Sequence, residues 1–366
     1  MSTLSDNGPK PRMPLPRDMA IVYQGGTFFL ALSAALYLAR EVLLPLVLAF
    51  FLKLLLQPGM KWLRRLRIPR LAAALFAVVL LVGVIAGLGD LLSSPAAHWA
   101  QRLPEGLPRL QERVRLISHP INALINLLKH AKSVVVGGGP SGPPVEDTDM
   151  QQLLLSTAHD LVSGFVWTML MLFFLLIAGD TFLRRLVEVM PTFGDKRQVI
   201  DISLQVECDI SVYLTTITIM NVLVGIITGL GMWWLGLSDP LLWGVVAFML
   251  NYVPIFGPIS GMGMFLGVGM LSLDPLWKAF LPMVLYLGIH VVEADIVTPV
   301  LLARSFTLNP VLVMASLLFW DWLWGIPGAV LAVPLLAIFK IICDRVEPLA
   351  ALGHFLEGER WRIWEP

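Results

Sequence analysis

The sequence predicts an all-α polytopic membrane protein of about eight transmembrane helices, with a broken sixth helix and an amphipathic helical extramembrane segment. Hydrophobic residues make up 57% of the 366 residues and charged residues only 14%, whereas soluble domains carry about 25% charged residues. Apolar runs long enough to cross a bilayer recur along the chain, because about 20 mostly apolar residues span the hydrocarbon core. The predicted spans lie near 20–39, 42–56, 70–92, 153–178, 209–236, 241–270, 276–303 and 309–342.

The charged loops between these spans predict the orientation of the chain. Loop 57–70 holds five basic residues and no acid, which places it in the cytoplasm because Lys and Arg are enriched in cytoplasmic loops. Alternation from this loop puts both termini in the cytoplasm and segment 93–150 outside. Lys53 interrupts the short second span, so we expect a tilted helix or a lysine that reaches the headgroups. The 26 Lys and Arg residues balance the 26 Asp and Glu residues, so no charge excess indicates a nucleic-acid partner.

The predicted spans and loops divide the chain into six consecutive regions. The division follows the apolar runs, the basic loops and one Gly/Pro-rich stretch. The regions are a cytoplasmic tail (1–19), three N-terminal transmembrane helices (20–92), an extracytoplasmic amphipathic helical segment with a Gly/Pro linker (93–150), the fourth transmembrane helix with a cytoplasmic amphipathic helix (151–207), a C-terminal transmembrane transport core (208–345) and a second cytoplasmic tail (346–366).

Segment 93–150 carries apolar residues at alternating spacings of four and three, which is the pattern of a heptad seam. Pro120 removes a backbone donor near the middle of this seam, so we expect two helices or a kink. The segment lies either on the membrane or its own subunit, or against another subunit as an oligomer seam. The seam residues are Leu103, Leu107, Leu110, Val114, Ile117, Ile121, Leu124 and Leu128.

No pattern in the sequence is typical of a soluble enzyme's active site. The two cysteines, Cys208 and Cys343, lack the spacing of a zinc site or a disulfide framework. The string GLGD at 87–90 resembles the Gly-x-Gly-Asp of intramembrane aspartyl proteases, but that chemistry requires a second carboxylate on a facing helix, and the neighbouring spans supply no such partner. We therefore expect no enzymatic activity, no cofactor and no metal site.

Helix breakers interrupt the apolar segments of the C-terminal half. The stretch NYVPIFGPISG at 251–261 is the first break, Thr298-Pro299 the second and WGIPG at 324–328 the third. Lipid offers no hydrogen-bond partners, so non-helical backbone at membrane depth faces protein or a water-filled cavity. Transporters use such breaks near the midplane to aim helix ends at substrates and ions. Glycine pairs also fit plain helix packing, namely Gly83/Gly87, Gly225/Gly229, Gly257/Gly261 and Gly263/Gly267.

Ionisable residues accompany these breaks in the same half of the chain. Each costs about 2.5–3.5 kcal/mol at membrane depth, so each is a functional candidate. His290 and Glu293 share a helical face and are expected to pair. Asp321 lies between two tryptophans, which also mark membrane interfaces, so it is either central or solvated. The predicted transport pathway contains Asn251, Pro254, Gly257, Pro258, Gly261, His290, Glu293, Asp295, Pro299 and Asp321.

The first break and the closing segment resemble one known family. NYVPIFGPISG resembles the Pro-aromatic/aliphatic-Gly-Pro signature of the autoinducer-2 exporter family of bacterial membrane permeases. The strings HVVEADIVTPVLLARSFTLNPVLV and LFWDWLWGIPGAVLAVPLLAIFKI resemble that family's closing block, and the resemblance covers roughly 205–345. The loop positions of the family fall on Pro254, Gly257 and Pro258, and those of the closing block on Glu293, Pro299, Arg304 and Pro310, which adds Arg304 to the predicted pathway.

The resemblance implies a secondary transporter in the bacterial inner membrane, with eight spans, both termini in the cytoplasm and no ATPase. It implies export of a small signalling molecule used in quorum sensing, or of a related small solute, by a homo-oligomer such as a pentamer. A Na⁺(Li⁺,K⁺)/H⁺ antiporter is the alternative, since that activity is ascribed to some members. A channel-like or scaffolding membrane protein is the second alternative. The expected partners are the lipid bilayer, a small-molecule or ion substrate and further copies of the chain.

Overall fold

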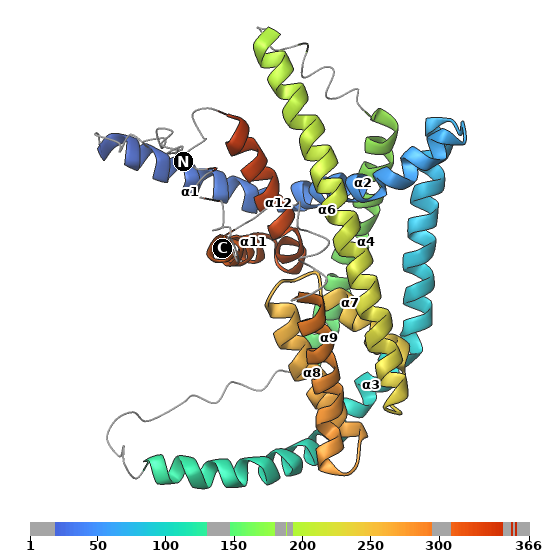
Figure 1. The fold of residues 1–366 in the computed structure, drawn as a ribbon, viewed down its shortest axis with the longest axis vertical. Helices are drawn as coiled ribbons and strands as arrows, with labels where there is room; N and C mark the ends of the chain where they lie inside the picture. The colour runs from blue at the N-terminus through green and yellow to red at the C-terminus, as the bar shows by residue number, and fades with distance from the viewer. Residues whose placement is uncertain are drawn as a thin grey trace, which may run out of the picture. The chain divides into compact units, whose positions relative to one another are not determined.

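The computed structural model describes residues 19–129, 147–179, 188, 193–294, 309–346, 353 and 356. Within these residues the chain is helical and contains no strand (Figure 1). The helices are α1 (Met19–Leu38), α2 (Arg40–Arg65), α3 (Arg70–Lys129), α4 (Asp147–Ala178), α6 (Phe193–Trp234), α7 (Pro240–Leu250), α8 (Phe256–Ser272), the 3-10 helix η1 (Leu276–Phe280), α9 (Leu281–Val292), α11 (Pro310–Trp324) and α12 (Ile326–Arg345).

Several of these helices have the length and apolar composition of membrane spans. Within the described residues four are long and apolar enough to cross a bilayer: Arg40–Arg65, Arg70–Gly106, Val199–Trp234 and Ile326–Asp344. Shorter apolar helices accompany them. The protein is therefore a helical membrane protein, whereas a total of eight spans stays a prediction.

The chain forms two compact units, each assembled from separate stretches of sequence. The first unit contains Met1–Val78, Gly164–Thr216 and Arg304–Pro366, and the second contains Val79–Ser163 and Ile217–Ala303. Helices α3, α4 and α6 each continue from one unit into the other along the chain. The predicted region boundary at 207/208 consequently falls inside the uninterrupted helix α6.

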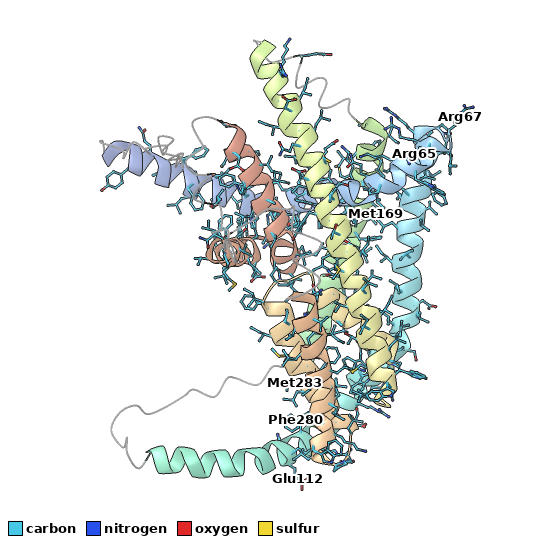
Figure 2. All side chains as sticks on the ribbon, viewed as in Figure 1. Arg65, Arg67, Glu112, Met169, Phe280 and Met283 are labelled. Carbon is cyan, nitrogen blue, oxygen red and sulfur yellow. The ribbon has the colours of Figure 1, made fainter. Side chains whose placement is uncertain are left out.

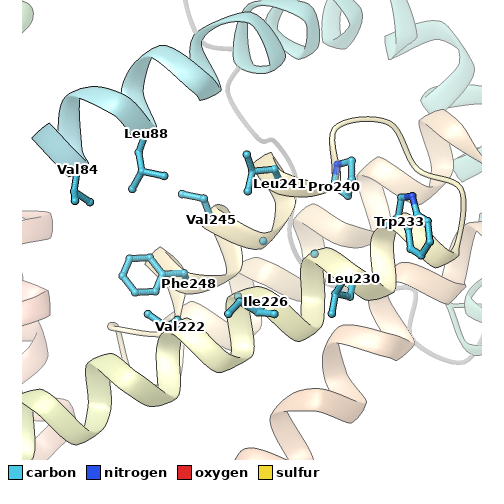
Figure 3. Close-up of a pocket in the computed structure, with 13 residues that line it drawn as sticks. Val84, Leu88, Val222, Ile226, Leu230, Trp233, Pro240, Leu241, Val245 and Phe248 are labelled. Atoms are coloured by element: carbon cyan, nitrogen blue, oxygen red, sulfur yellow. The ribbon is translucent and has the colours of Figure 1, made fainter.

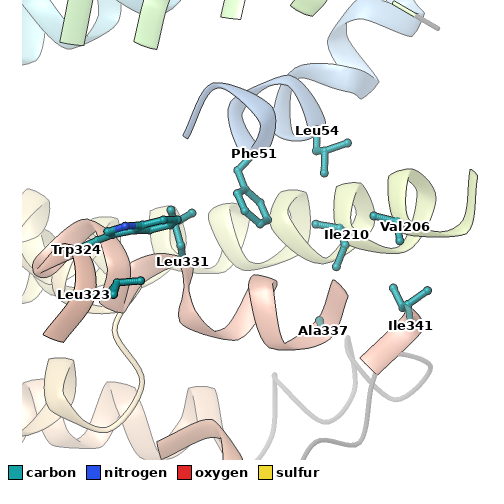
Figure 4. Packing of buried hydrophobic residues seen from close by; sticks show 9 residues of the cluster. All are labelled: Phe51, Leu54, Val206, Ile210, Leu323, Trp324, Leu331, Ala337 and Ile341. Atoms are coloured by element: carbon teal, nitrogen blue, oxygen red, sulfur yellow. The ribbon is translucent and has the colours of Figure 1, made fainter. Parts of the chain in front are cut away.

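The core of the first unit lies where α2, α6, α11 and α12 pack together (Figure 4). Ser211 of α6 donates a hydrogen bond of 2.8 Å to the carbonyl of Leu54 in α2. Lys53 of α2 pairs with Glu207 of α6 at 2.8 Å. The tilted helix and the lysine that reaches the headgroups both stay predictions. The buried apolar residues are Phe51, Leu54, Val206, Ile210, Leu323, Trp324, Leu331, Ala337 and Ile341.

Helices α11 and α12 form an antiparallel hairpin. The hydroxyl of Ser316 donates to the carbonyl of Ala332 at 3.0 Å, although a straight helix would hold these residues about 24 Å apart. The chain reverses at Gly325, which has a φ of 65° that favours glycine. The third predicted break is thus a hairpin turn, and the expectation of one crossing over 309–342 is wrong.

Helices α7 and α8 of the second unit also form a hairpin. The rings of Trp243 in α7 and Phe265 in α8 have centroids 6.0 Å apart, whereas a straight helix would separate these residues by about 33 Å. The 11 residues of α7 rise only about 16 Å, too little to cross the hydrocarbon core. Segment 241–270 is therefore not one span broken in its middle, which corrects the prediction of a broken sixth helix: the chain turns back at 251–255.

The residues of the first break explain this reversal. Pro254 cannot donate a backbone hydrogen bond, and Ile255 takes a φ of 66°, which is unusual for a β-branched residue. Gly257 lies so close to the carbonyl of Leu250 that a Cβ atom at this position would overlap it. Each of these features is local, and together they end one helix and start the next within five residues.

Glycines also set the distance between α6 and α7. A Cβ atom on Gly225 would lie 2.8 Å from the carbonyl oxygen of Gly244, and one on Gly244 would lie 2.7 Å from the carbonyl oxygen of Gly225. The two backbones therefore touch directly, as small residues allow in membrane helices. Gly83 and Gly263, by contrast, face open space. Of the glycine pairs noted in the sequence, Gly225/Gly229 lies in a close helix crossing.

Helix α3 runs unbroken through Pro120 to Lys129. The expectation of two separate helices is wrong, and the kink at Pro120 stays a prediction. Leu103 of the seam is exposed and Leu110 is half-buried, while the side chains of Leu107 and of the seam residues from Val114 onward lie outside the described part.

The arginines beside the seam join α3 to the end of α8 within the second unit. Arg113 is buried and donates to the carbonyls of Met270 and Leu273, at 2.6 and 2.8 Å, where α8 ends. It also pairs with Asp274, as does Arg109, whose Nη2 lies 2.6 Å from the carboxylate. The last carbonyls of a helix have no partner within the helix. Arg113 therefore caps α8 from a distant part of the chain.

Replacing Arg113 by alanine is expected to loosen the end of α8. The uncapped carbonyls of Met270 and Leu273 lose their donors, which costs about 1–3 kcal/mol. Amide hydrogen exchange over 268–276 should accelerate in Arg113→Ala and stay unchanged in Arg102→Ala, an exposed arginine of the same helix. Equal exchange in both variants would show that the cap does not stabilise this turn.

Candidate functional site

A buried polar network lies among the apolar helices of the second unit. It begins at Asn251, the residue after α7, whose Nδ2 donates to Oδ1 of Asn221 in α6 at 2.8 Å. The same Nδ2 lies 3.4 Å from Oε1 of Glu293, which follows α9. Asn221 is fully buried. The turn that ends α7 therefore joins an amide of α6 to a carboxylate at the end of α9.

Glu293 also pairs with His290, one helical turn before it. Nδ1 of His290 lies 3.2 Å from Oε2 of Glu293, and both side chains are largely buried, at 8% and 17% exposure. If Nδ1 carries the proton and donates it to the carboxylate, Nε2 of His290 is a hydrogen-bond acceptor. The helical spacing that predicted this pair accounts for its geometry.

Tyr286 extends the network from α9 towards α8. Its ring lies edge-on to that of His290 with centroids 4.4 Å apart, and 4.6 Å from that of Phe265 in α8. A Cβ atom on Gly261 would lie 2.5 Å from the hydroxyl of Tyr286. Gly261 of the first break thus provides the space that this hydroxyl occupies.

The turn at 251–255 is attached to α6 by a second hydrogen bond. The hydroxyl of Tyr252 donates to Oγ1 of Thr218 at 2.9 Å. Asn251 and Tyr252 are adjacent, so two consecutive side chains bind the same helix. This double attachment holds the turn beside Asn221 and supports the orientation of Asn251 towards Glu293.

Three polar atoms of the network have no hydrogen-bond partner among the described residues. They are Nδ2 of Asn221, the hydroxyl oxygen of Tyr286 and Nε2 of His290. A buried polar group without a partner costs about 1–3 kcal/mol, and such groups in native proteins usually bind water or a ligand. The network therefore offers a donor, an acceptor and a hydroxyl to a polar molecule.

The structure brings together some of the predicted pathway residues and separates others. Asn251, His290 and Glu293 are in the network, and Gly261 contacts it through Tyr286. Pro254, Gly257 and Pro258 form the adjoining turn and the start of α8. Asp321 is an exposed residue of α11 in the first unit, outside this network. Asp295, Pro299 and Arg304 lie outside the described residues.

The sequence analysis missed Thr218, Asn221, Tyr252 and Tyr286. These are uncharged polar residues, whereas the predicted pathway contains residues of the helix breaks and charged or imidazole side chains. Asn221 in the run ITIMNVLVGI was detectable as an amide inside a predicted span. Tyr286 could not be detected in this way, because tyrosine is common in apolar segments. Its role depends on the contact between its hydroxyl and Gly261, which only the structure shows.

A large apolar pocket of the second unit is separate from this network (Figure 3). It has a volume of about 580 Å³ and lies between α3, α6 and α7. Its walls include Val84, Leu88, Ile226 and Phe248, and no charged side chain lines it. This pocket has the chemistry of a lipid-facing groove and offers nothing to orient a polar solute.

Substituting Gly261 by alanine is expected to destabilise the network. The new Cβ atom collides with the hydroxyl of Tyr286, and overpacking of this kind costs about 1–3 kcal/mol. Gly263→Ala is the matched control, because Gly263 lies in the same helix and faces open space. Thermal unfolding in detergent should show a lower Tm for Gly261→Ala alone. Identical Tm values would mean that Tyr286 moves away without cost.

Known proteins resemble this chain over most of its length. The family model described as AI-2E family transporter matches residues 27–347. The AI-2 transport protein TqsA of Escherichia coli (strain K12) is 27% identical over 320 residues, which cover 84% of this chain and 87% of that protein. The putative transport protein YhhT of the same strain is 27% identical over 318 residues, covering 84% and 86%. The putative transport protein YrrI of Bacillus subtilis (strain 168) is 24% identical over 314 residues, covering 83% and 86%.

These matches extend the resemblance beyond the motifs that first indicated it. The sequence signature was specific over roughly 205–345, whereas the family model begins at residue 27 and includes segment 93–150. The similar proteins are transport proteins or putative transport proteins, and each alignment covers more than four fifths of this chain. The prediction of the family is confirmed, and the chain belongs to the AI-2E family of transporters.

Proposed function

We propose that the protein is a secondary transporter that exports a small, neutral, hydroxyl-bearing solute across the bacterial inner membrane. The observation that carries this proposal is the buried network of Asn221, Asn251, His290 and Glu293, with its unpaired polar atoms, among apolar helices. The similarity to TqsA, named as an AI-2 transport protein, supports a signalling molecule or a related small solute as the cargo.

The hydrogen-bonding capacity of the network supports a hydroxylated solute. The free Nδ2 of Asn221 is a donor, Nε2 of His290 is an acceptor in the tautomer above, and the Tyr286 hydroxyl is both. A hydroxyl group also donates and accepts, so several hydroxyls on one molecule satisfy all three. The turn at 251–255 positions Asn251 between α6 and α9 and is the element whose movement would alter the network.

Glu293→Gln and Asn221→Leu are expected to reduce transport by about fivefold or more. Glu293→Gln replaces one acceptor oxygen by an NH2 donor that faces Asn251 or His290, and Asn221→Leu removes a buried amide; either change costs about 1–3 kcal/mol. Efflux of AI-2 from matched proteoliposomes is the measurement. Asp90→Asn is the control, since Asp90 is exposed in the same unit. Wild-type efflux by both network variants would contradict the proposed site. Proton flux that requires added Na⁺, Li⁺ or K⁺, with no AI-2 efflux, would identify the antiporter instead.

We also propose that the seam of α3 joins copies of the chain. The arginines beside the seam are bound within the second unit, while Leu103 is exposed. An apolar heptad pattern of this regularity is typical of helices that pack against a partner helix. The seam would then bury its leucines and isoleucines between subunits, in a homo-oligomer such as a pentamer.

Glutamate at both Leu110 and Ile117 is expected to dissociate that oligomer, because each places a charge in an apolar contact. Native mass spectrometry of the purified protein reports the subunit number directly. Arg102→Glu, which changes an exposed residue of the same helix, should leave the number of subunits unchanged. An intact oligomer in the double variant would assign the seam to contacts within one subunit.

A further inference from the structure

A small polar cavity lies in the first unit, where the ends of several helices meet. Its volume is about 70 Å³, which is room for several water molecules. Helix α2 contributes Lys53, Gln57 and Arg64, α3 contributes Arg70, and α6 contributes Glu207. Gly179, directly after α4, closes one side. Groups from four parts of the chain therefore face one space.

The side chains of this cavity carry an excess of positive charge. Lys53 and Glu207 neutralise each other in a salt bridge of 2.8 Å. Arg64 and Arg70 also line the cavity, and neither has an acidic partner among the described residues. Both arginines are exposed residues. Two guanidinium groups without a counter-ion beside one cavity favour an anion, and guanidinium groups match the geometry of phosphate oxygens.

Gly179 lies beside one of these guanidinium groups. It ends α4 with a φ of 51°, and a Cβ atom on it would lie 3.4 Å from Nη1 of Arg70. Arg70 is also the first residue of α3, where free backbone N–H groups add positive potential. The start of α3 thus adds to the positive potential that Arg70 brings to the cavity.

Gln57 adds a requirement of the opposite kind. Its Nε2 lies 3.5 Å from Glu207, but its buried Oε1 has no donor among the described residues. A simple anion satisfies the arginines and leaves this acceptor unpaired. A phosphodiester whose substituent carries a hydroxyl satisfies both the arginines and this acceptor, since the hydroxyl donates to Oε1 of Gln57.

We propose that this cavity binds the headgroup of an anionic phospholipid whose phosphodiester carries a hydroxylated substituent, the chemistry of phosphatidylglycerol. Loop 57–70 is predicted to lie at the cytoplasmic surface, where lipid phosphates are plentiful. Figure 2 shows Arg65 and Arg67 at the turn from α2 to α3, so the cavity adjoins a basic surface that attracts anionic lipids. The arginines bind the phosphodiester, and Gln57 selects the hydroxylated headgroup.

The test measures lipid binding by native mass spectrometry of the full-length protein at increasing lipid concentration. Arg64→Ala combined with Arg70→Ala is expected to weaken phosphatidylglycerol binding about 25-fold, at roughly fivefold for each basic residue. Lys61→Ala combined with Arg65→Ala removes the same charge from positions outside the cavity and should weaken binding much less, because these residues supply only the general attraction of the basic surface. An equal Tm for the two double variants establishes that both are folded.

Gln57→Leu separates headgroup selection from charge. It should weaken binding of phosphatidylglycerol about fivefold and leave binding of phosphatidylmethanol, a phosphodiester without the hydroxyl, unchanged. Equal effects on both lipids would overturn the role of the hydroxyl.

Three results would overturn the cavity as a lipid site. The first is equal weakening by the cavity pair and the surface pair, which would indicate general surface charge. The second is competition by millimolar inorganic phosphate that abolishes lipid binding, which would identify a free-phosphate site. The third is no effect of the cavity pair on lipid binding.

Discussion

The close approach of Gly257 to the carbonyl of Leu250 is the contact on which the second unit depends. It lets the chain turn back within five residues, so that α7 and α8 lie side by side. A larger residue at this position would open the turn and separate Trp243 from Phe265. Asn251 sits at the end of α7 only because the turn is this tight, and its contacts with Asn221 and Glu293 follow from that position.

The same physical solution recurs in the first unit. Gly325 reverses the chain between α11 and α12, and a Cβ atom on Gly328 would overlap the carbonyl of Trp320. Backbone groups released at a break need partners, because lipid supplies none. A hairpin places the freed groups against a neighbouring helix of the same unit, where a straight but interrupted helix would expose them. Both predicted breaks that the structure describes are hairpin turns for this reason.

Polar side chains of both units are held inside apolar surroundings by pairing. Lys53 forms a salt bridge with Glu207, and the imidazole of His290 contacts the carboxylate of Glu293. Each of these groups would be costly alone at membrane depth. The pairing is incomplete in each unit, since Gln57 in one and Tyr286 in the other retain an unpaired atom. Incomplete pairing distinguishes a candidate binding site from a purely structural salt bridge. The unpaired atoms of the two units differ in their surroundings. Oε1 of Gln57 lies in a cavity that Arg64 and Arg70 also line, whereas the unpaired hydroxyl of Tyr286 lies among apolar helices without a basic side chain of Lys or Arg in its network.

Local properties of the amino-acid sequence determined much of this protein. Hydropathy located helices such as α1 within one residue of the predicted 20–39, helical spacing predicted the His290–Glu293 pair, and motif residues indicated the family. Only the tertiary structure decided the chain direction after each break, and with it the contacts of Asn251, Tyr286 and Lys53. Proline and glycine end a helix but do not specify the angle that follows. That angle comes from packing between residues far apart in sequence, such as Trp243 on Phe265 and Ser316 on Ala332.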